Sequence, residues 1–218
     1  MFNREGFMDE LFNMLFRFGH ILVGITWIGL LYYFNFVQTE YFKEAEEDAR
    51  KDAVAKLAPR ALWWFRWAAF LTFLTGLALL HYISVKITLE IILGAVMGTL
   101  MMLNVWGIIW PNQKIVIGLK EGDAAVAGPK AALASRTNTL FSVGMLYFMV
   151  ASAHYPASGQ ILGANLEMTG LLVGLAVIFA IEANAIWGKM LPAITSVRSV
   201  IVSSFVLCIA LSSVAYYL

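Results

Sequence analysis

Cysteine is almost absent from this chain, and charged residues are scarce. Cys208 is the single cysteine among 218 residues, so no disulfide framework can form within the chain. A lone cysteine also excludes paired-cysteine metal sites and a covalently attached c-type haem, whose attachment needs C-x-x-C-H. Only 13% of the residues are charged, the net charge is +1, and no basic run is present. We therefore expect no nucleic-acid partner.

Hydrophobic residues are abundant instead. They make up 61% of the chain, which includes seven Trp and ten Met. A soluble globular protein is close to half apolar and a quarter charged, so the composition predicts a protein of the lipid bilayer. The first apolar segment is too long, and at Arg17 too charged, for the apolar region of a signal peptide. We therefore expect the N-terminus to be retained.

Six apolar runs are long enough, or nearly so, to cross a bilayer, which takes about 20 helical residues. The sequence shows no internal repeat and no second domain, so residues 1–218 are expected to form one all-α membrane bundle of six transmembrane helices. The fourth run is short and is expected to extend at one end. The predicted spans are Leu11–Val37, Ala61–Ile83, Ile87–Trp110, Thr137–Ala153, Met168–Trp187 and Ser199–Leu218.

The distribution of Lys and Arg predicts the orientation of these spans. Twelve of the 15 basic residues fall on one side, and only Arg4, Arg17 and Lys86 fall on the other. Because basic residues accumulate on the cytoplasmic side, both termini are expected on the outer, periplasmic side of a bacterial inner membrane. The inner segment 38–60 has i,i+4 charge pairs, so the first span is expected to continue into it as a helix. These pairs are Glu46/Arg50, Glu47/Lys51 and Asp52/Lys56.

Two carboxylates and one proline inside or beside the spans lead to further expectations. Glu90 lies near the outer start of the third span and is expected at the interface. Glu182 lies within the fifth span, where a charge needs a partner such as Arg66, Arg198 or Lys189; a proton path is the alternative. Pro111 follows Trp110 and is expected to end the third span.

The chain has three histidines, and the predicted topology places all of them in or near the outer half of the bilayer. His20 lies in the first span, His81 near the end of the second, and His154 at the end of the fourth. Ionisable groups inside a membrane are costly and are commonly functional. The alternative is a histidine that hydrogen-bonds a neighbouring helix as a packing element. The spacing does not decide which two histidines would pair.

His20 has neighbours on its helical face that suit a b-type haem. Arg17, Gly24 and Trp27 share this face with it, because they lie three or four residues apart in succession. Imidazole can ligate the haem iron, a glycine lets a flat ligand approach the backbone, and a guanidinium can pair with a propionate. We therefore predict haem b, with His20 and His154 as candidate iron ligands and His81 as a third candidate.

Three longer strings resemble a known family. They are HILVGITWIGLLYYFNFVQ from His20, NVWGIIWPNQK from Asn104, and ASRTNTLFSVGMLYFMVASAHYP from Ala134. Together they resemble the membrane domain of the bacterial cytochrome-c-linked urate oxidases, the urate hydroxylase PuuD family. The resemblance implies an inner-membrane protein linked to electron transfer through cytochrome c. In that family a c-type cytochrome domain follows, whereas this sequence stops at Leu218 without C-x-x-C-H, so a separate cytochrome partner is expected.

A looser resemblance concerns the first span alone. The pattern His20, Trp27, Gly29 with Tyr32 or Tyr33 is similar to the first span of membrane-bound protoporphyrinogen oxidases and of copper-resistance membrane proteins. In the former family, a histidine of this kind is associated with haem b. This resemblance supports the haem prediction and implies no substrate.

Three functions remain open at this point. The first is a redox protein that exchanges electrons with a cytochrome c or a quinone, and whose enzymatic form would oxidise urate or another small substrate beneath the outer loop His154–Glu167. The second is a non-catalytic integral subunit of a larger respiratory or monooxygenase complex. The third is a transporter, which the absence of an inverted repeat and of interrupted helix pairs disfavours.

Overall fold

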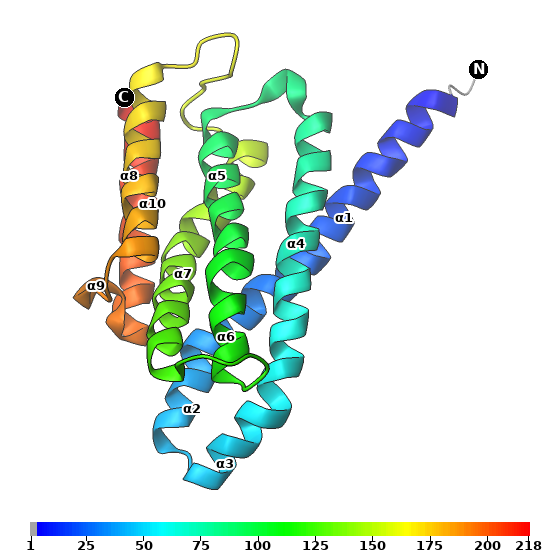
Figure 1. Ribbon diagram of the computed structural model, residues 1–218. Coiled ribbons are helices and arrows are strands. Elements are labelled where there is room, and N and C mark those ends of the chain that lie inside the picture. Colours follow the sequence, from blue (N-terminus) through cyan, green and yellow to red (C-terminus); the bar gives the residue numbers. More distant parts are fainter. Residues whose placement is uncertain (1–3) are drawn as a thin grey trace.

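The structure, a computed structural model, describes residues 4–218, and this part of the chain is an all-α bundle without a β-strand. Six long helical segments cross the bundle (Figure 1). The first turn of α1 and the last turn of α10 lie at the same end of the bundle. The crossing segments are α1 (Arg4–Tyr32), α4 (Ala58–Tyr82), α5 (Leu89–Asn104) continued by α6 (Trp110–Val116), α7 (Ala124–His154), α8 (Met168–Trp187) and α10 (Val197–Tyr217).

Short helices and wide helical turns connect or extend these segments. A π-helical segment follows α1, a second precedes α4, and a third joins α5 to α6. A π turn holds one extra residue and changes the direction in which the following side chains point. These connecting elements are Tyr33–Gln38 (π), α2 (Thr39–Glu44), α3 (Glu47–Asp52), Ala53–Leu57 (π), Ser84–Lys86 (3₁₀), Val105–Ile109 (π) and α9 (Pro192–Thr195).

The predicted multi-pass membrane class is confirmed by helix length and composition. Five helical segments in residues 4–218 are long and apolar enough to cross a membrane, and α7 is not one of them. α7 is nevertheless central, because it packs against α5, α6, α8 and α10. It carries five polar residues that are each at most 6% exposed: Arg136, Thr137, Asn138, Thr139 and Ser142. A helix enclosed by other helices can carry such residues without exposing them to lipid, so its low apolar content follows from its position.

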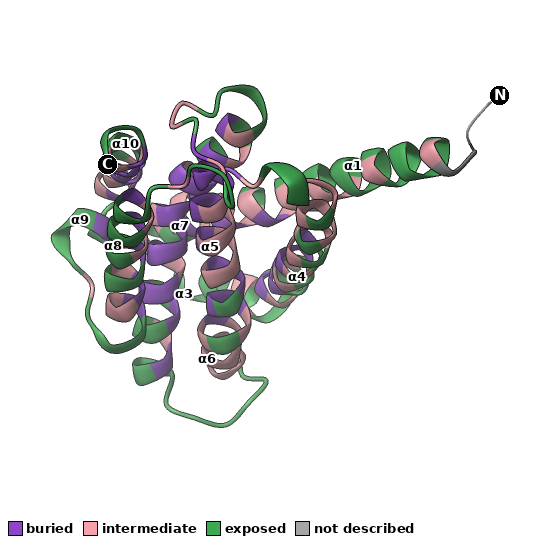
Figure 2. Cartoon of the chain, turned by 90° about the horizontal axis from the view of Figure 1, so that it is seen from above, coloured by how far each residue is buried: buried purple, intermediate pink, exposed green. Residues whose placement is uncertain are grey.

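α1 and α4 form an antiparallel pair at the edge of the bundle. Thr72 of α4 faces Gly24, and the ring of Tyr82 at the end of α4 lies 6.2 Å from the ring of Phe16. The first half of α1 diverges from the remaining helices (Figure 2). Further along α1, large apolar side chains such as Ile21 and Ile25 are more than 60% exposed. This surface is suited to contact with lipid.

The segment that follows the third predicted span corrects one expectation. Pro111 does not end the helix, which continues through α6 to Val116. The proline lies in the first turn of α6, directly after the π-helical segment Val105–Ile109. A first-turn position does not need the N–H that proline lacks, and the wide turn before it moves the preceding carbonyls away from the ring.

The inner segment between α1 and α4 is helical as predicted, and two of its three charge pairs form. Lys51 contacts Glu47 at 2.6 Å, and Lys56 contacts Asp52. The predicted Glu46/Arg50 pair was wrong. Glu46 is the N-cap of α3 with an extended backbone (ψ 152°), so its side chain does not lie on the helical face that carries Arg50.

Candidate functional site

His20 is held between α1 and α4 by a directional hydrogen bond. Its Nδ1 lies 3.0 Å from the Thr75 hydroxyl, which also lies 2.7 Å from the Leu71 carbonyl oxygen. A hydroxyl has one proton, and here the helix carbonyl accepts it, so the hydroxyl oxygen is left to accept from the imidazole. This arrangement favours the Nδ1–H tautomer, in which Nε2 carries the lone pair that a metal ion would need.

The depth and the packing of His20 are set by α4. Thr75 lies seven residues before the end of α4 at Tyr82, which corresponds to about 10 Å along the helix axis. A Cβ atom added to Gly76 would lie 3.2 Å from His20 Cε1, so the glycine gives the imidazole its space. His20 is thus a partly buried histidine whose ring is packed between α1 and α4, about two turns from the end of α4.

The other predicted residues on the His20 face have separate environments. Gly24 faces the Thr72 methyl group, which lies 4.0 Å from where a Cβ would be, so α4 covers this glycine. Trp27 is buried, and its indole Nε1 has no hydrogen-bond partner. Arg17 is exposed and its Nε donates to Asn13 Oδ1 at 2.9 Å. Trp27 and His20 therefore both turn toward the bundle, whereas Arg17 does not.

The other two histidines, His81 and His154, lie at the C-terminal ends of their helices, at the same end of the bundle. His81 is exposed one residue before the end of α4, with its ring against Tyr82. His154 is exposed at the last residue of α7. No hydrogen bond or ring contact joins any two of the three histidines in residues 4–218, and no group of three or more His, Cys, Asp or Glu side chains gathers there. The choice of a second haem ligand stays a prediction.

A buried polar cluster lies further toward the other end of the bundle, where three helices meet. The Asn104 side-chain amide of α5 donates to Glu182 Oε2 of α8 and to Asn138 Oδ1 of α7, both at 3.0 Å. Asn138 in turn donates to the Met101 carbonyl oxygen at 2.9 Å. The three side chains are at most 5% exposed. We call Asn104, Asn138 and Glu182 the amide–carboxylate cluster.

The partner of Glu182 differs from the predicted one. Arg66, Arg198 and Lys189 were the expected counter-ions, and none of them is within ion-pair distance of its carboxylate. The ion pairs found in residues 4–218 are confined to Lys43, Lys51 and Lys56 of the inner segment. Arg66 instead stacks on the Trp110 ring at 3.9 Å from its centroid. Glu182 is therefore hydrogen-bonded to a neutral amide.

Further hydrogen bonds connect α1 and α10 to the same stretch of α7. Tyr32 lies 2.9 Å from Ser142 between their hydroxyl oxygens, and Asn35 donates to the Ser135 hydroxyl at 2.8 Å. The Ser204 hydroxyl of α10 lies 2.9 Å from the Thr139 carbonyl oxygen. α7 is thus bonded through polar side chains to α1, to the π-helical segment that follows α1, to α5 and to α10.

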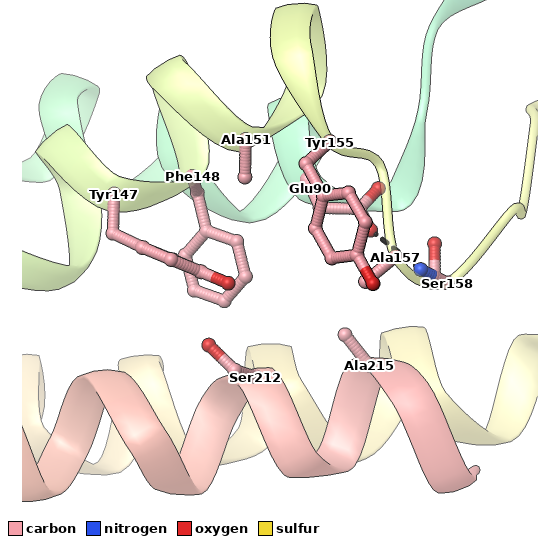
Figure 3. Close-up of a pocket in the computed structure, with 9 residues that line it drawn as sticks. All are labelled: Glu90, Tyr147, Phe148, Ala151, Tyr155, Ala157, Ser158, Ser212 and Ala215. Carbon is pink, nitrogen blue, oxygen red and sulfur yellow. Dashed lines mark hydrogen bonds between the residues drawn. The ribbon is translucent and has the colours of Figure 1, made fainter.

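A small cavity lies between α5, α7, α10 and the loop after α7, near the end of the bundle where α5 begins (Figure 3). Glu90 lies in the first turn of α5, near the helix end as predicted from the sequence, and is 3% exposed because the loop after α7 covers it. Its Oε1 accepts the Ser158 amide at 2.9 Å, and its Oε2 is buried without a partner. Tyr147 and Ser212 add hydroxyl groups to the lining, and the volume of about 10 Å³ is close to the space of one water molecule. Glu90 thereby fastens the loop after α7 across the end of the bundle.

Sequence reasoning missed the amide–carboxylate cluster because its members are far apart in the chain. Asn104 and Asn138 each occur in a string that resembles the urate oxidases, but neither residue stands out alone. Glu182 is the one member that composition could indicate, as a carboxylate inside an apolar span. The π-helical segment that begins at Val105 has no recognisable sequence pattern.

The fold and the buried polar groups define an integral-membrane helical bundle with ionisable and amide side chains between its helices. A family model described as "Urate oxidase N-terminal" matches residues 84–211, which is more than half of the chain. The chain belongs to this family, as the resemblance predicted. No curated protein and no solved structure matches the chain. The matched range contains His154, Glu90 and the whole amide–carboxylate cluster, whereas His20 and His81 precede it.

Proposed function

We propose that this protein is a membrane-embedded redox component of the urate oxidase type, in the inner membrane of a bacterium. In this proposal, haem b is bound near the periplasmic face with His20 as one iron ligand, and electrons pass to a separate cytochrome c or to a quinone. Family membership supports the relation to urate oxidation. The 3.0 Å contact between His20 Nδ1 and the Thr75 hydroxyl is the observation that supports the haem ligand, because it orients the ring through Nδ1 and leaves Nε2 for the iron.

The surroundings of His20 fit a bound haem in part: the Thr75 contact and the Trp27 indole N–H fit it, whereas Gly24 and Arg17 do not add support. The hydrogen bond to Thr75 orients the imidazole and leaves Nε2 for the iron, which is the usual arrangement of a ligating histidine. The buried Trp27 Nε1 lacks a partner, and a polar group of a ligand could supply one. Gly24 is covered by α4 and Arg17 points away, so neither supports the propionate-binding arrangement.

The residues of the chain would have distinct tasks. His20 would hold the iron at Nε2, Thr75 would keep the ring from rotating, and Gly76 would keep space for it. Haem would supply one-electron chemistry when bound. His154 or His81 would complete the coordination, and the loop that Glu90 fastens would limit access of water from the outer side.

A visible difference spectrum of the purified protein, reduced with dithionite minus oxidised, tests this function. We expect a b-type band, with a pyridine haemochrome assay giving the number of haems per chain. His20→Ala should remove the band, and Thr75→Val should weaken haem retention by 10-fold or more, as expected when an outer-shell partner is lost. A folded, haem-supplemented preparation without haem absorbance would overturn the proposal.

Matched histidine variants identify the second ligand. His154→Ala and His81→Ala should differ, because only the residue that ligates iron changes the spin state and the band position. Thr26→Val is a suitable control in α1, since Thr26 bonds only the Leu22 carbonyl of its own helix. This control should leave the spectrum unchanged.

A non-catalytic subunit of a larger membrane complex is the second candidate, and α1 carries the observation that favours it. Asn13 and Arg17 bond each other on a helix whose neighbouring surface is apolar and largely exposed. Polar side chains within spans usually face protein or water. If a partner helix covers them, Arg17→Leu should release a co-purifying subunit on native gels. If the unmodified protein and Arg17→Leu both run as a single haem-containing species with the mass of one chain, this candidate is contradicted.

A further inference from the structure

We propose that Glu182 is a proton-exchange site of the membrane domain. It holds a proton in the resting protein and exchanges it with the aqueous phase nearest to the end of α8. The link of this exchange to electron transfer rests on the function proposed above; the proton site itself does not.

The first support is the absence of a counter-charge around a deeply buried carboxyl group. Glu182 is 5% exposed, and its Oε2 accepts from the neutral Asn104 amide at 3.0 Å. The described residues place no Lys, Arg or His within ion-pair distance of it. An unpaired carboxylate in an apolar interior costs far more than the neutral acid, so the acid form is the stable one.

The second support is the way the amide groups are used. Both protons of Asn104 Nδ2 are committed, one to Glu182 and one to Asn138, and Asn138 is oriented by the Met101 carbonyl. This chain fixes the direction of every amide and presents a donor to Glu182 Oε2. Its Oε1 is then the oxygen available for the exchangeable proton. A cluster that served only for packing would not need a titratable member.

The third support is the short distance from Glu182 to the end of α8. Glu182 lies five residues before Trp187, the last residue of α8, which corresponds to about 7.5 Å along the axis. Asn184 lies two residues after Glu182. Its side-chain amide donates to the Lys189 carbonyl oxygen and accepts from the Lys189 backbone N–H, beyond the end of α8. Arg136, the titratable residue nearest to Asn138 on α7, is buried but makes no ion pair with Glu182.

Electron transfer gives such a site a use. A negative charge added to a low-dielectric interior stabilises the protonated form of a nearby carboxyl group. Electron uptake is therefore coupled to proton uptake, and electron loss to proton release. Under the proposed function, Glu182 would release its proton to the aqueous phase when an electron leaves the bundle for the acceptor. It would take up one proton again when the next electron enters.

Infrared spectroscopy of the full chain in lipid nanodiscs tests the proton site without requiring haem. We expect a carboxylic-acid C=O band at pH 7 that shifts in D₂O. The band should disappear in Glu182→Gln, which keeps the acceptor for Asn104, and persist in Glu90→Gln and in the exposed control Glu167→Gln. A spectrum of Glu182→Gln that retains the whole band, or a band that does not shift in D₂O, would overturn the proposal.

A second variant keeps the test decisive if Glu182→Gln does not fold. Asn104→Ala removes the amide that bonds Oε2 and should move the band to higher wavenumber while Glu182 stays in place. An unchanged band position in a folded Asn104→Ala protein would contradict the assignment. A folded, haem-supplemented protein that binds no haem and still shows the exchangeable band would refute the redox function and leave the proton site standing.

Discussion

The α1–α4 pair and the group of helices α5, α7, α8 and α10 are built by different rules. The pair is held by close contacts of Gly24 with Thr72 and of Gly76 with His20, and much of its surface is apolar and exposed. The four-helix group surrounds buried amides and carboxylates that bond from helix to helix. The family match covers this second group, and not the pair.

The two regions differ in whether their polar residues stand out in the sequence or only in the folded structure. His20 in the pair is conspicuous because histidine is rare in the chain, although its surroundings are ordinary helix packing. Asn104 and Asn138 in the group are inconspicuous as residue types, yet they are nearly inaccessible and determine how three helices meet. A rare residue type thus directs attention to the α1–α4 pair, whereas burial of polar side chains directs it to the four-helix group. Variants in each region can be compared experimentally.

The largest expected effect comes from breaking the amide–carboxylate cluster. Asn104→Leu leaves Glu182 Oε2 and Asn138 Oδ1 without their donor, which should lower the free energy of unfolding by about 2–4 kcal/mol, since each unpaired buried group costs about 1–3 kcal/mol. Denaturant titration in detergent measures this. Thr75→Val in the α1–α4 pair is the matched variant and should cost about 1 kcal/mol or less. Equal losses would remove the distinction between the two regions.

An intermediate effect should follow from adding side chains at two glycines. A Cβ at Gly94 of α5 would lie 3.2 Å from Phe148 Cβ and 3.4 Å from the Met149 amide nitrogen of α7, whereas nothing lies within 4 Å at Gly29 of α1. Gly94→Val should cost about 2–3 kcal/mol by overpacking. Gly29→Val should change stability by about 0.5 kcal/mol or less, because a helical glycine is itself unfavourable. Thermal unfolding with both variants in parallel checks the contrast.

The smallest expected effect concerns the outer loop. Glu90→Ala removes the acceptor of the Ser158 amide, which should cost about 1 kcal/mol and increase hydrogen exchange in residues 155–163. Glu167→Ala is the matched control, because its exposed side chain lies at the start of α8. If both variants leave the loop equally protected, Glu90 does not fasten it.

Much of the fold was predictable from local sequence. Each of the six predicted runs coincides with one of the six long helical segments to within a few residues at its ends, except that the fourth extends as expected, chiefly by 13 residues before Thr137 to Ala124. Errors arose where the chain deviates from a regular helix. The π turn before Trp110 made Pro111 compatible with a continuing helix, and the extended backbone at Glu46 removed one charge pair.

The candidate site was less predictable. His20, Trp27 and Glu182 could be singled out because each is unusual for its position in an apolar span. Their partners could not, since Thr75 lies 55 residues from His20 and Asn104 lies 78 residues from Glu182. The predicted counter-ions of Glu182 were chosen by charge, and the structure supplies a neutral amide instead.

The sequence by itself determined that this chain is helical, that it belongs in a bilayer, and roughly where its helices begin and end. These properties depend on apolar length and on local helix formation, which neighbouring residues control. Only the tertiary structure decided that α7 is enclosed, that α1 diverges from the bundle, and which polar groups meet. Helix packing sets those contacts, and it depends on surfaces that lie far apart along the chain.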